Sequence, residues 1–417
     1  MRCWSRLFAA AAQAAVAAAL FAPRMSWARD ISFAQARAAA ERAAPDIQLA
    51  ERRVDVSTAD VQVAGALANP TLTVSTAHQT ARLGTSIGLP LPLFGQRGTA
   101  MRAARGDADA AVLDVEVVRR EVRWRATVAW VDLWQAQERA RLLELAAKDA
   151  DRLFQIASEK FDAGTGPRLD VIRTKADWAR AASEAEAGLH LAGAAAARLA
   201  PWIGAPPDET ITATGLPSYP DALLAFTAPN LEDRLSDHPT LHRDKALVTA
   251  ATLHIQNEER LRWPTVTPQF TVNQFDPTLP GPDFIVGLSF DLPVLSLRGG
   301  AIARAQAQRA LAEMTVTADE RRLRAELLDA YRRTEGARVR LRALREQVLP
   351  SMKEARDMTE EGYRSGRVDL LRLLDAQRAL LDSRLAEAEA AASWSRAVAD
   401  LENATGSTFT EGGTHAP

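Results

Sequence analysis

The chain has 417 residues, a formal net charge of -2 and charged side chains at 25% of its positions. Its arginines alternate with Asp and Glu along helical stretches and form no sustained basic cluster, so we expect no nucleic-acid partner. The only cysteine is Cys3 and the six histidines are scattered, which excludes a disulfide framework and argues against a metal centre.

The first 28 residues have the layout of a secretory signal peptide. Arg2 and Arg6 provide a positive start, an apolar run follows, and Ser26-Trp27-Ala28 ends on a small residue. We therefore expect cleavage after Ala28. Cys3 precedes the apolar run, whereas a lipoprotein cysteine follows it, so no lipid anchor is expected. No later stretch is apolar for about 18 residues, so the mature chain is expected to have no transmembrane helix.

The rest of the chain contains two copies of one pattern. Leu91-Pro92 and Arg97-Gly98 return as Leu292-Pro293 and Arg298-Gly299, about 200 positions later. Other pairs of motifs keep the same order and a similar spacing. We interpret this pattern as a tandem duplication.

The duplication divides the chain into segments. The first copy covers 29–200 and the second covers 230–408. A linker rich in Pro, Gly and Thr joins them at 201–229, and a tail at 409–417 is expected to be disordered.

Each copy has the same order of elements. A helical segment, at about 31–66 and at about 230–262, leads to a β-hairpin at about 70–93 and about 264–293. The second hairpin has the clearer signal, because its apolar side chains alternate with mostly polar ones. These apolar residues are Phe284, Val286, Leu288, Phe290 and Leu292. A period of two predicts strands with two unlike faces.

A very long helix follows each hairpin. Apolar residues, many of them alanine, recur at intervals of three and four from Val122 to Phe161 and again from Leu323 to Val348. This spacing is typical of a coiled-coil seam. From about Gly98 to Lys160 such a helix would extend roughly 95 Å. Because it cannot be the core of a compact monomer, it must lie beside other helices.

The four predicted strands limit the possible assemblies. Strands of roughly 9–10 residues can cross a bilayer when tilted, but the smallest ordinary barrels have about eight strands. An open sheet edge in lipid is costly, so several chains would have to share one barrel. The alternative is a periplasmic coiled-coil scaffold without a pore. That alternative does not explain why a hairpin occurs at the same place in each copy.

Three motifs carry a family resemblance. Asn69-Pro70-Thr71-Leu72 resembles the entry to the first strand in the TolC-type outer membrane efflux family. The stretch 91–97, Leu-Pro-Leu-Phe-Gly-Gln-Arg, resembles the strand exit of the branch that serves heavy-metal efflux, and Gly366 to Leu380 resembles the motif after the second helical turn. The resemblance extends from about Ile31 to Thr408.

The resemblance implies a mainly α fold with a small β part. Three chains would form a twelve-stranded transmembrane β-barrel in outer-membrane lipid, continued by a periplasmic α-barrel of coiled-coil helices. It also implies docking to a periplasmic adaptor (membrane fusion) protein and an inner-membrane pump of RND type. The conducted substrates would be metal cations. Drug efflux and type I secretion ducts share the fold and remain alternatives.

The resemblance places a periplasmic gate at the helix tips. In the family, two acidic positions one helical turn apart line the constriction. Asp375 matches the second, whereas Arg372 occupies the first. Asp369 can supply the missing acid one turn earlier, and Asp170 matches the tip aspartate in the first copy. The gate is then either an acidic ring or an Arg372–Asp375 pairing, and the alternative is an ordinary solvated helix end.

The adaptor contacts of the family lie at the two turns. Here these turns contain Gly164 and Thr165 in the first copy, and Gly366 and Arg367 in the second. A tight reversal alone requires glycine, so Thr165 and Arg367 are the better candidates for recognition.

No catalytic or cofactor site is predicted, and no metal site. His238 and His242 are four apart, but no third ligand is nearby, so we expect a solvated pair. Glycine-rich phosphate loops are absent from the sequence. The chain is therefore not expected to be an enzyme, and energy for transport would come from a partner.

Overall fold

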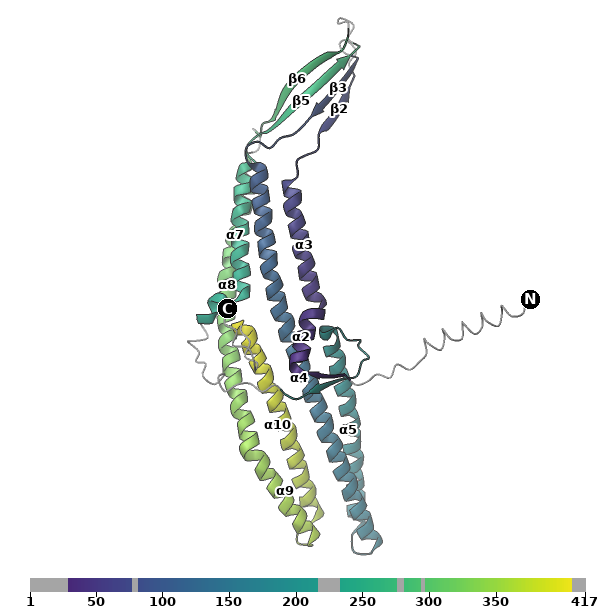
Figure 1. Cartoon of the computed structure of the whole chain (residues 1–417). Helices are drawn as coiled ribbons and strands as arrows, with labels where there is room; N and C mark the ends of the chain where they lie inside the picture. The colour runs from purple at the N-terminus through teal and green to yellow at the C-terminus, as the bar shows by residue number, and fades with distance from the viewer. Residues whose placement is uncertain (1–28, 77–81, 217–232, 276–280, 294–296, 407–417) are drawn as a thin grey trace, which may run out of the picture.

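The computed structural model describes residues 29–76, 82–216, 233–275, 281–293 and 297–406. The molecule is long and narrow, with a small sheet at one end and two helical hairpins at the other (Figure 1). The expected signal peptide at 1–28 and tail at 409–417 lie outside the described residues, as does part of the linker at 201–229. Within the described residues, no helix is both long and apolar enough to span a membrane.

The two copies have the same sequence of elements. The first contains β1 (Arg29–Ser32), α2 (Phe33–Ala43), α3 (Pro45–Gly65), β2 (Thr71–Ser75), β3 (Leu83–Gly88), α4 (Gln96–Asp162) and α5 (Arg168–Ile203). The linker contains β4 (Ile211–Thr214). The second copy contains the 3₁₀ helix η2 (Asp233–Asp237), α7 (Pro239–Arg260), β5 (Thr265–Gln274), β6 (Asp283–Asp291), α8 (Gly299–Ala343), the π-helical turn η3 (Leu344–Val348), α9 (Leu349–Arg364) and α10 (Leu370–Thr405).

Two expected helices are shorter than predicted. The segment 31–66 begins as strand and breaks at Ala44, and the segment 230–262 becomes α-helical only at Pro239. Pro45 and Pro239 cause these breaks, because proline lacks an N–H and cannot continue a helix, whereas it suits the first position of a new one. The strand β1 pairs in parallel with β4 in the linker, which the sequence did not predict.

The second long helix is also interrupted. We expected one seam through Val348, but α8 passes through the π-helical turn η3 into α9. Pro350 lies in the first turn of α9, where its missing N–H breaks the ordinary helical bonding pattern and the π turn accommodates the break. The first long helix, α4, is continuous over 67 residues.

The hairpins form one antiparallel sheet in the order β2-β3-β5-β6. The strands β5 and β6 have 10 and 9 residues, as predicted for a crossing strand, but the described parts of β2 and β3 have only 5 and 6. The strands β2 and β6 each have one neighbour and form the open edges of the sheet.

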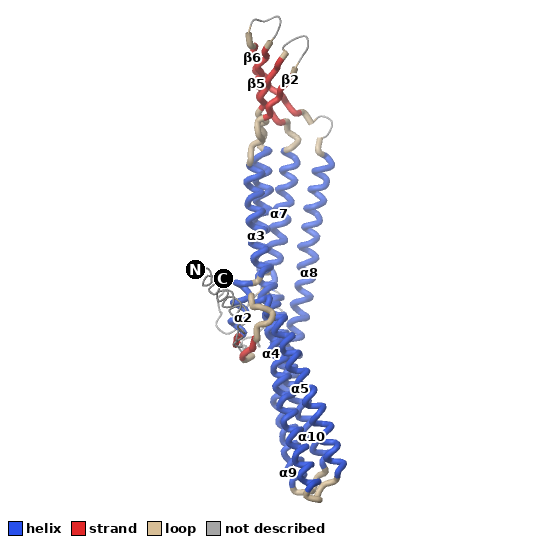
Figure 2. The backbone as a smooth tube through the Cα atoms, turned by 90° about the vertical axis from the view of Figure 1, so that its right-hand side faces the viewer, coloured by secondary structure: helices blue, strands red, loops and turns tan. Residues whose placement is uncertain are grey.

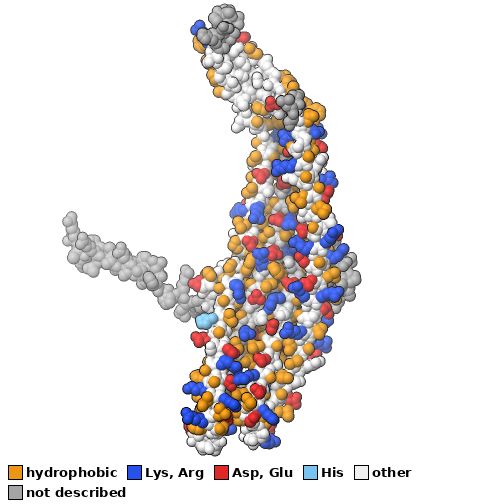
Figure 3. All heavy atoms as spheres, turned by 180° about the vertical axis from the view of Figure 1, so that it is seen from behind, with side chains coloured by type: hydrophobic (Ala, Val, Ile, Leu, Met, Phe, Trp, Pro, Cys, Tyr) orange, Lys and Arg blue, Asp and Glu red, His pale blue; other side chains and the backbone are white. Residues whose placement is uncertain are grey.

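The register gives the sheet two different faces. Leu72 lies opposite Ile87, Ile87 opposite Phe270, and Phe270 opposite Val286, so apolar side chains form a row across all four strands. The alternate positions are mostly Thr, Ser, Gln, Asn and Gly. The only charged residues in the four strands are Asp283 and Asp291, at the two ends of β6. Figure 3 shows the same contrast, with charged side chains crowding on the helices and sparse on the sheet.

The helices form a layer beneath the sheet. In the half nearer the sheet, α3 packs on α4, α4 on α7, and α7 on α8, so α3 and α8 form the two outer edges (Figure 2). In the other half, α4 packs on α5 and α10. The densest core lies between these halves, where Trp130 is fully buried and donates its Nε1–H to the carbonyl of Ile31 at 3.1 Å.

Candidate functional site

The two helical hairpins reverse in the same way. Gly164 and Gly366 each adopt the left-handed conformation, with φ of 72° in both. The next residue in each turn, Thr165 or Arg367, donates its backbone N–H to a carbonyl five residues earlier at 2.8 Å. This pattern is a Schellman motif, in which glycine avoids the strain of a Cβ atom. The duplication is therefore preserved down to the hydrogen bonds of the tips.

The residues that follow the glycines differ between the copies. The Thr165 hydroxyl donates to the Lys160 carbonyl at 3.1 Å, whereas the Arg367 Nε donates to the Ser365 hydroxyl at 2.9 Å. Both side chains are exposed at the end of the molecule farthest from the sheet. Glycine is explained by the turn alone, whereas Thr165 and Arg367 are exposed tip side chains that a partner could contact.

The predicted gate residues of the second copy lie in the first two turns of α10. Asp369 is the N-cap of this helix, and its carboxylate accepts a hydrogen bond from the Arg372 backbone N–H at 3.1 Å. Arg372 and Asp375 are exposed, and no ion pair joins either of them to another described residue. Arg372 also places a cation at the positive end of the helix dipole, which is unfavourable. The Asp369 carboxylate partly offsets that cost as the N-cap, but no ion pair within the described residues neutralises the Arg372 guanidinium.

Asp170 is the first-copy counterpart of Arg372. It lies in the first turn of α5, where a carboxylate is favoured by the helix dipole. The two copies therefore present opposite charges at equivalent positions. Within the described residues of one chain, no hydrogen bond or ion pair joins Asp170 to Asp369, Arg372 or Asp375.

Side chains that the sequence analysis did not single out connect the two hairpins. The Arg378 guanidinium of α10 forms an ion pair with Asp177 of α5. Nearer the tips, the Lys160 ammonium of α4 lies 4.2 Å from the centre of the Tyr363 ring of α9. Both contacts join residues about 200 positions apart, which is the spacing of the repeat. The repeat makes these positions nearly equivalent in the two copies, but only the structure shows that they meet.

A cleft lies between the two hairpins. It has a volume of about 150 Å³ and is lined by α4, α5, α9 and α10. Its walls are leucine-rich, and its charged side chains include both Asp177 and Arg378. Movement of one hairpin against the other would therefore have to break the Arg378–Asp177 ion pair.

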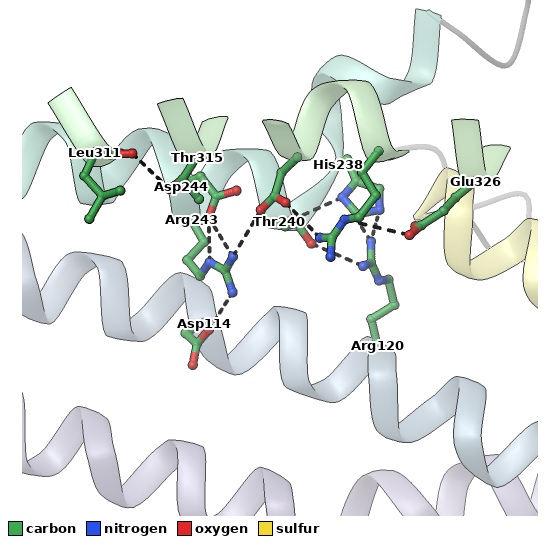
Figure 4. A network of polar contacts seen from close by, with 11 residues as sticks. Asp114, Arg120, His238, Thr240, Arg243, Asp244, Leu311, Thr315 and Glu326 are labelled. Carbon is green, nitrogen blue, oxygen red and sulfur yellow. Dashed lines mark hydrogen bonds and ion pairs between the residues drawn. The ribbon is translucent and has the colours of Figure 1, made fainter. Parts of the chain in front are cut away.

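A second polar cluster lies between the sheet and the tips (Figure 4). His238 is the N-cap of α7, and its Nδ1 accepts a hydrogen bond from the Thr240 backbone N–H at 3.3 Å. The Arg120 guanidinium of α4 contacts the His238 ring and donates to the Thr240 hydroxyl at 3.3 Å. The expected solvated histidine pair is therefore wrong for His238, which is 0% exposed, although His242 is exposed. His238 is buried because it caps a helix at its contact with α4.

The same cluster continues along α7 through the partly buried Arg243 and the buried Asp244. Arg243 binds Asp244 at 2.6 Å, Asp114 of α4 at 3.3 Å and Asp319 of α8 at 4.0 Å, so it connects α7 to two other helices. Burial raises the pKa of Asp244. Among the described residues, no group of His, Cys, Asp or Glu could hold a metal ion.

The buried histidine predicts a pH dependence of stability. Burial, and then the charge of Arg120, lower the pKa of His238 from 6.5 to about 4. Between these values the unfolded chain binds a proton that the folded chain does not. The contribution of His238 to the free energy of unfolding is therefore fully present above about pH 6.5. It decreases as the pH falls towards 4, by up to about 3 kcal/mol.

Denaturation of the wild-type protein at pH 7.5 and 5.0 measures this loss. His238→Asn keeps a capping side chain but removes the titrating ring, so its loss between the two pH values should be smaller. His242→Asn, four residues away and exposed, is the control and should behave as wild type. An equal loss in all three proteins would contradict the assignment to His238.

Comparison with known proteins gives consistent matches. A family model described as outer membrane efflux protein matches residues 36–205 and 247–407. The cobalt-zinc-cadmium resistance protein CzcC of Cupriavidus metallidurans is 26% identical over 345 residues, which cover 82% of this chain and 81% of that protein. Nodulation protein T of Rhizobium leguminosarum bv. trifolii is 26% identical over 396 residues, covering 87% and 83%. The solved structure of the outer-membrane channel OprN has the same fold, with a TM-score of 0.75, 21% identity and 90% coverage of each chain.

Proposed function

Because the chain belongs to the outer membrane efflux protein family, we propose that it is the outer-membrane duct of a tripartite pump. We propose that this pump exports metal cations. The role of the chain is conduction and not catalysis, as expected from the sequence. The observation that carries the proposal is the sheet. One of its faces is apolar in register across all four strands, whereas the other is mostly polar. This is the alternation of a strand that contacts lipid on one side and water on the other.

The open edges support a homotrimer. The strands β2 and β6 are unpaired on one side, and unpaired backbone groups in lipid cost several kcal/mol each. The helices α3 and α8 likewise form the two open edges of the helical layer, and both expose large apolar side chains. They include Leu49, Val56 and Val63 of α3, and Leu311 and Met314 of α8. Three copies joined edge to edge would close a twelve-stranded barrel and continue it as a helical barrel.

The tips support a periplasmic partner. Thr165 and Arg367 are exposed at the end farthest from the proposed membrane sheet, where an adaptor protein would meet the duct. We further propose that an inner-membrane pump provides the energy, since no phosphate-binding motif occurs in the sequence. The resemblance to the heavy-metal branch favours a pump of RND type. Metal cations are favoured as substrates by two observations. These are the resemblance of residues 91–97 to the heavy-metal branch and the similarity to a cobalt-zinc-cadmium resistance protein.

Deletion of the gene tests the substrate class. We expect growth to become sensitive to divalent metal salts and to remain unchanged with hydrophobic drugs. Sensitivity to drugs alone would make this chain a drug duct of the same fold. Failure to secrete a protein, with neither sensitivity, would indicate a type I secretion duct. If the chain is soluble after cell breakage, it is a scaffold without a pore.

The proposed gate predicts a change in conductance. In a closed ring, Asp375 of one chain can pair with Arg372 of its neighbour, which would neutralise a guanidinium that forms no ion pair among the described residues of its own chain. Asp375→Ala should therefore raise single-channel conductance, by about twofold or more, or alter cation selectivity. Asp382→Ala removes an exposed carboxylate further along α10 and is the control. Conductance and selectivity equal to wild type in planar bilayers would remove Asp375 from the gate.

A further inference from the structure

Apolar side chains continue past the ends of the strands. Leu93 lies in the turn after β3, and Leu292 directly follows β6. Both leucines are exposed, at 63% and 64%. Charged side chains become frequent only after them, where the helices begin (Figure 3). The junction between sheet and helices is therefore where an apolar surface gives way to a charged one.

Two aromatic rings lie at this junction. Phe94 and Trp263 stack with their ring centres 5.4 Å apart, and both are exposed. Gln96 fixes their backbones, because its Oε1 accepts from the Phe94 N–H at 2.9 Å and its Nε2 donates to the Trp263 carbonyl at 3.2 Å. A rigidly held Trp ring that is exposed to water buries little apolar surface and so adds little to stability. It is typical of a membrane–water interface, where one part of the ring is in an apolar layer and the N–H is hydrated.

Two arginines flank Trp263. Arg260, Arg262 and Trp263, with Glu259, line an open hollow of about 600 Å³. The Arg262 Nε donates to the Leu297 carbonyl at 2.8 Å, which orients the guanidinium. No carboxylate of the described chain forms an ion pair with Arg260 or Arg262, whereas the nearby Arg298 binds Glu258 at 2.7 Å. The dipole of α7 accounts for a cation at Arg260, its last residue, but not for Arg262 or Trp263.

We propose that Phe94, Trp263, Arg260 and Arg262 form a collar that binds the headgroup of an anionic phospholipid at the periplasmic boundary of the membrane. The rings lie at the level of the glycerol esters, and the two guanidinium groups bind the phosphate. Arginine suits this role because its planar group donates two parallel hydrogen bonds to phosphate oxygens. The proposal rests on the proposed function in one respect, which is that the sheet is in a bilayer.

Measuring how deep labelled residues lie in the bilayer distinguishes the proposed collar from the proposed membrane location of the sheet. The only cysteine is Cys3, so Cys3→Ser allows a single spin label at any other position. Labels on Val286→Cys, in the middle of β6, and Trp263→Cys, at the junction, are compared in vesicles. We expect oxygen to reach the first label best, and oxygen and a water-soluble nickel reagent to reach the second about equally. A fully aqueous Trp263→Cys label with a buried Val286→Cys label overturns the collar alone. Two aqueous labels overturn the membrane location itself.

Lipid dependence tests the arginines. Phosphatidylglycerol added to the detergent-solubilised protein should raise its Tm more than phosphatidylcholine does. That difference should be lost in the double variant Arg260→Gln, Arg262→Gln. The control is Arg321→Gln, Arg324→Gln, which removes two exposed arginines of α8 that also lack an ion pair within the described chain. A difference retained in the first double variant, or lost equally in the control, overturns the proposal. Inorganic phosphate alone should leave Tm unchanged, and an equal rise would assign the site to free phosphate.

Discussion

Val286→Arg should abolish the outer-membrane trimer. Val286 lies in the middle of β6, 81% exposed, opposite Phe270 on the apolar face of the sheet. An arginine at the midplane of a bilayer costs about 2–4 kcal/mol, and a trimer would contain three of them. We expect the membrane-inserted trimer, measured by fractionation and unheated gel electrophoresis, to fall at least about tenfold.

The neighbouring polar face provides the matched control. Ser289 lies on the same strand but on the opposite face, where it pairs with Thr267. Ser289→Arg introduces the same charge and side-chain volume, and we expect the trimer to remain near the wild-type amount. Equal losses in both variants would show that β6 tolerates no bulk, and equal retention would mean that the apolar face does not contact lipid.

Bulky residues at both tips should abolish resistance without reducing the trimer. Thr165 and Arg367 occupy equivalent positions after the tip glycines, and their side chains are exposed. The double variant Thr165→Trp, Arg367→Trp leaves Gly164 and Gly366 in place, so the reversals should form. If the adaptor docks at the tips as proposed, metal resistance should fall to the level of the gene deletion, because bulky side chains there would keep the adaptor away.

The control for this variant is Lys175→Trp, an exposed position further along α5. This variant places a single tryptophan on the first hairpin, away from its tip, and cells that carry it should retain metal resistance. Resistance that survives the double substitution would mean that the adaptor docks elsewhere. A loss of trimer in the double variant would instead assign these side chains a structural role.

Much of the architecture was predictable because it is local or periodic. The glycines at Gly164 and Gly366 mark reversals that any long antiparallel pair requires, and the structure has both as Schellman motifs. The alternation from Phe284 to Phe290 predicted a strand with two faces, and β6 is that strand. The breaks before Pro45 and Pro239 were not predicted, although proline is a local signal that permits them.

The sequence alone established the duplication, the hairpins, the long helices and the tip turns, because backbone propensity and side-chain period specify these within a few residues.

The remaining features depend on how the helices are rotated against one another. Only the tertiary structure decided that His238 is buried against Arg120, that Arg378 binds Asp177, and that the Arg372 guanidinium forms no ion pair among the described residues. Such contacts join residues far apart in the chain, and a small rotation of either helix would separate them. Local propensity does not determine that rotation. It follows from the packing of the whole layer.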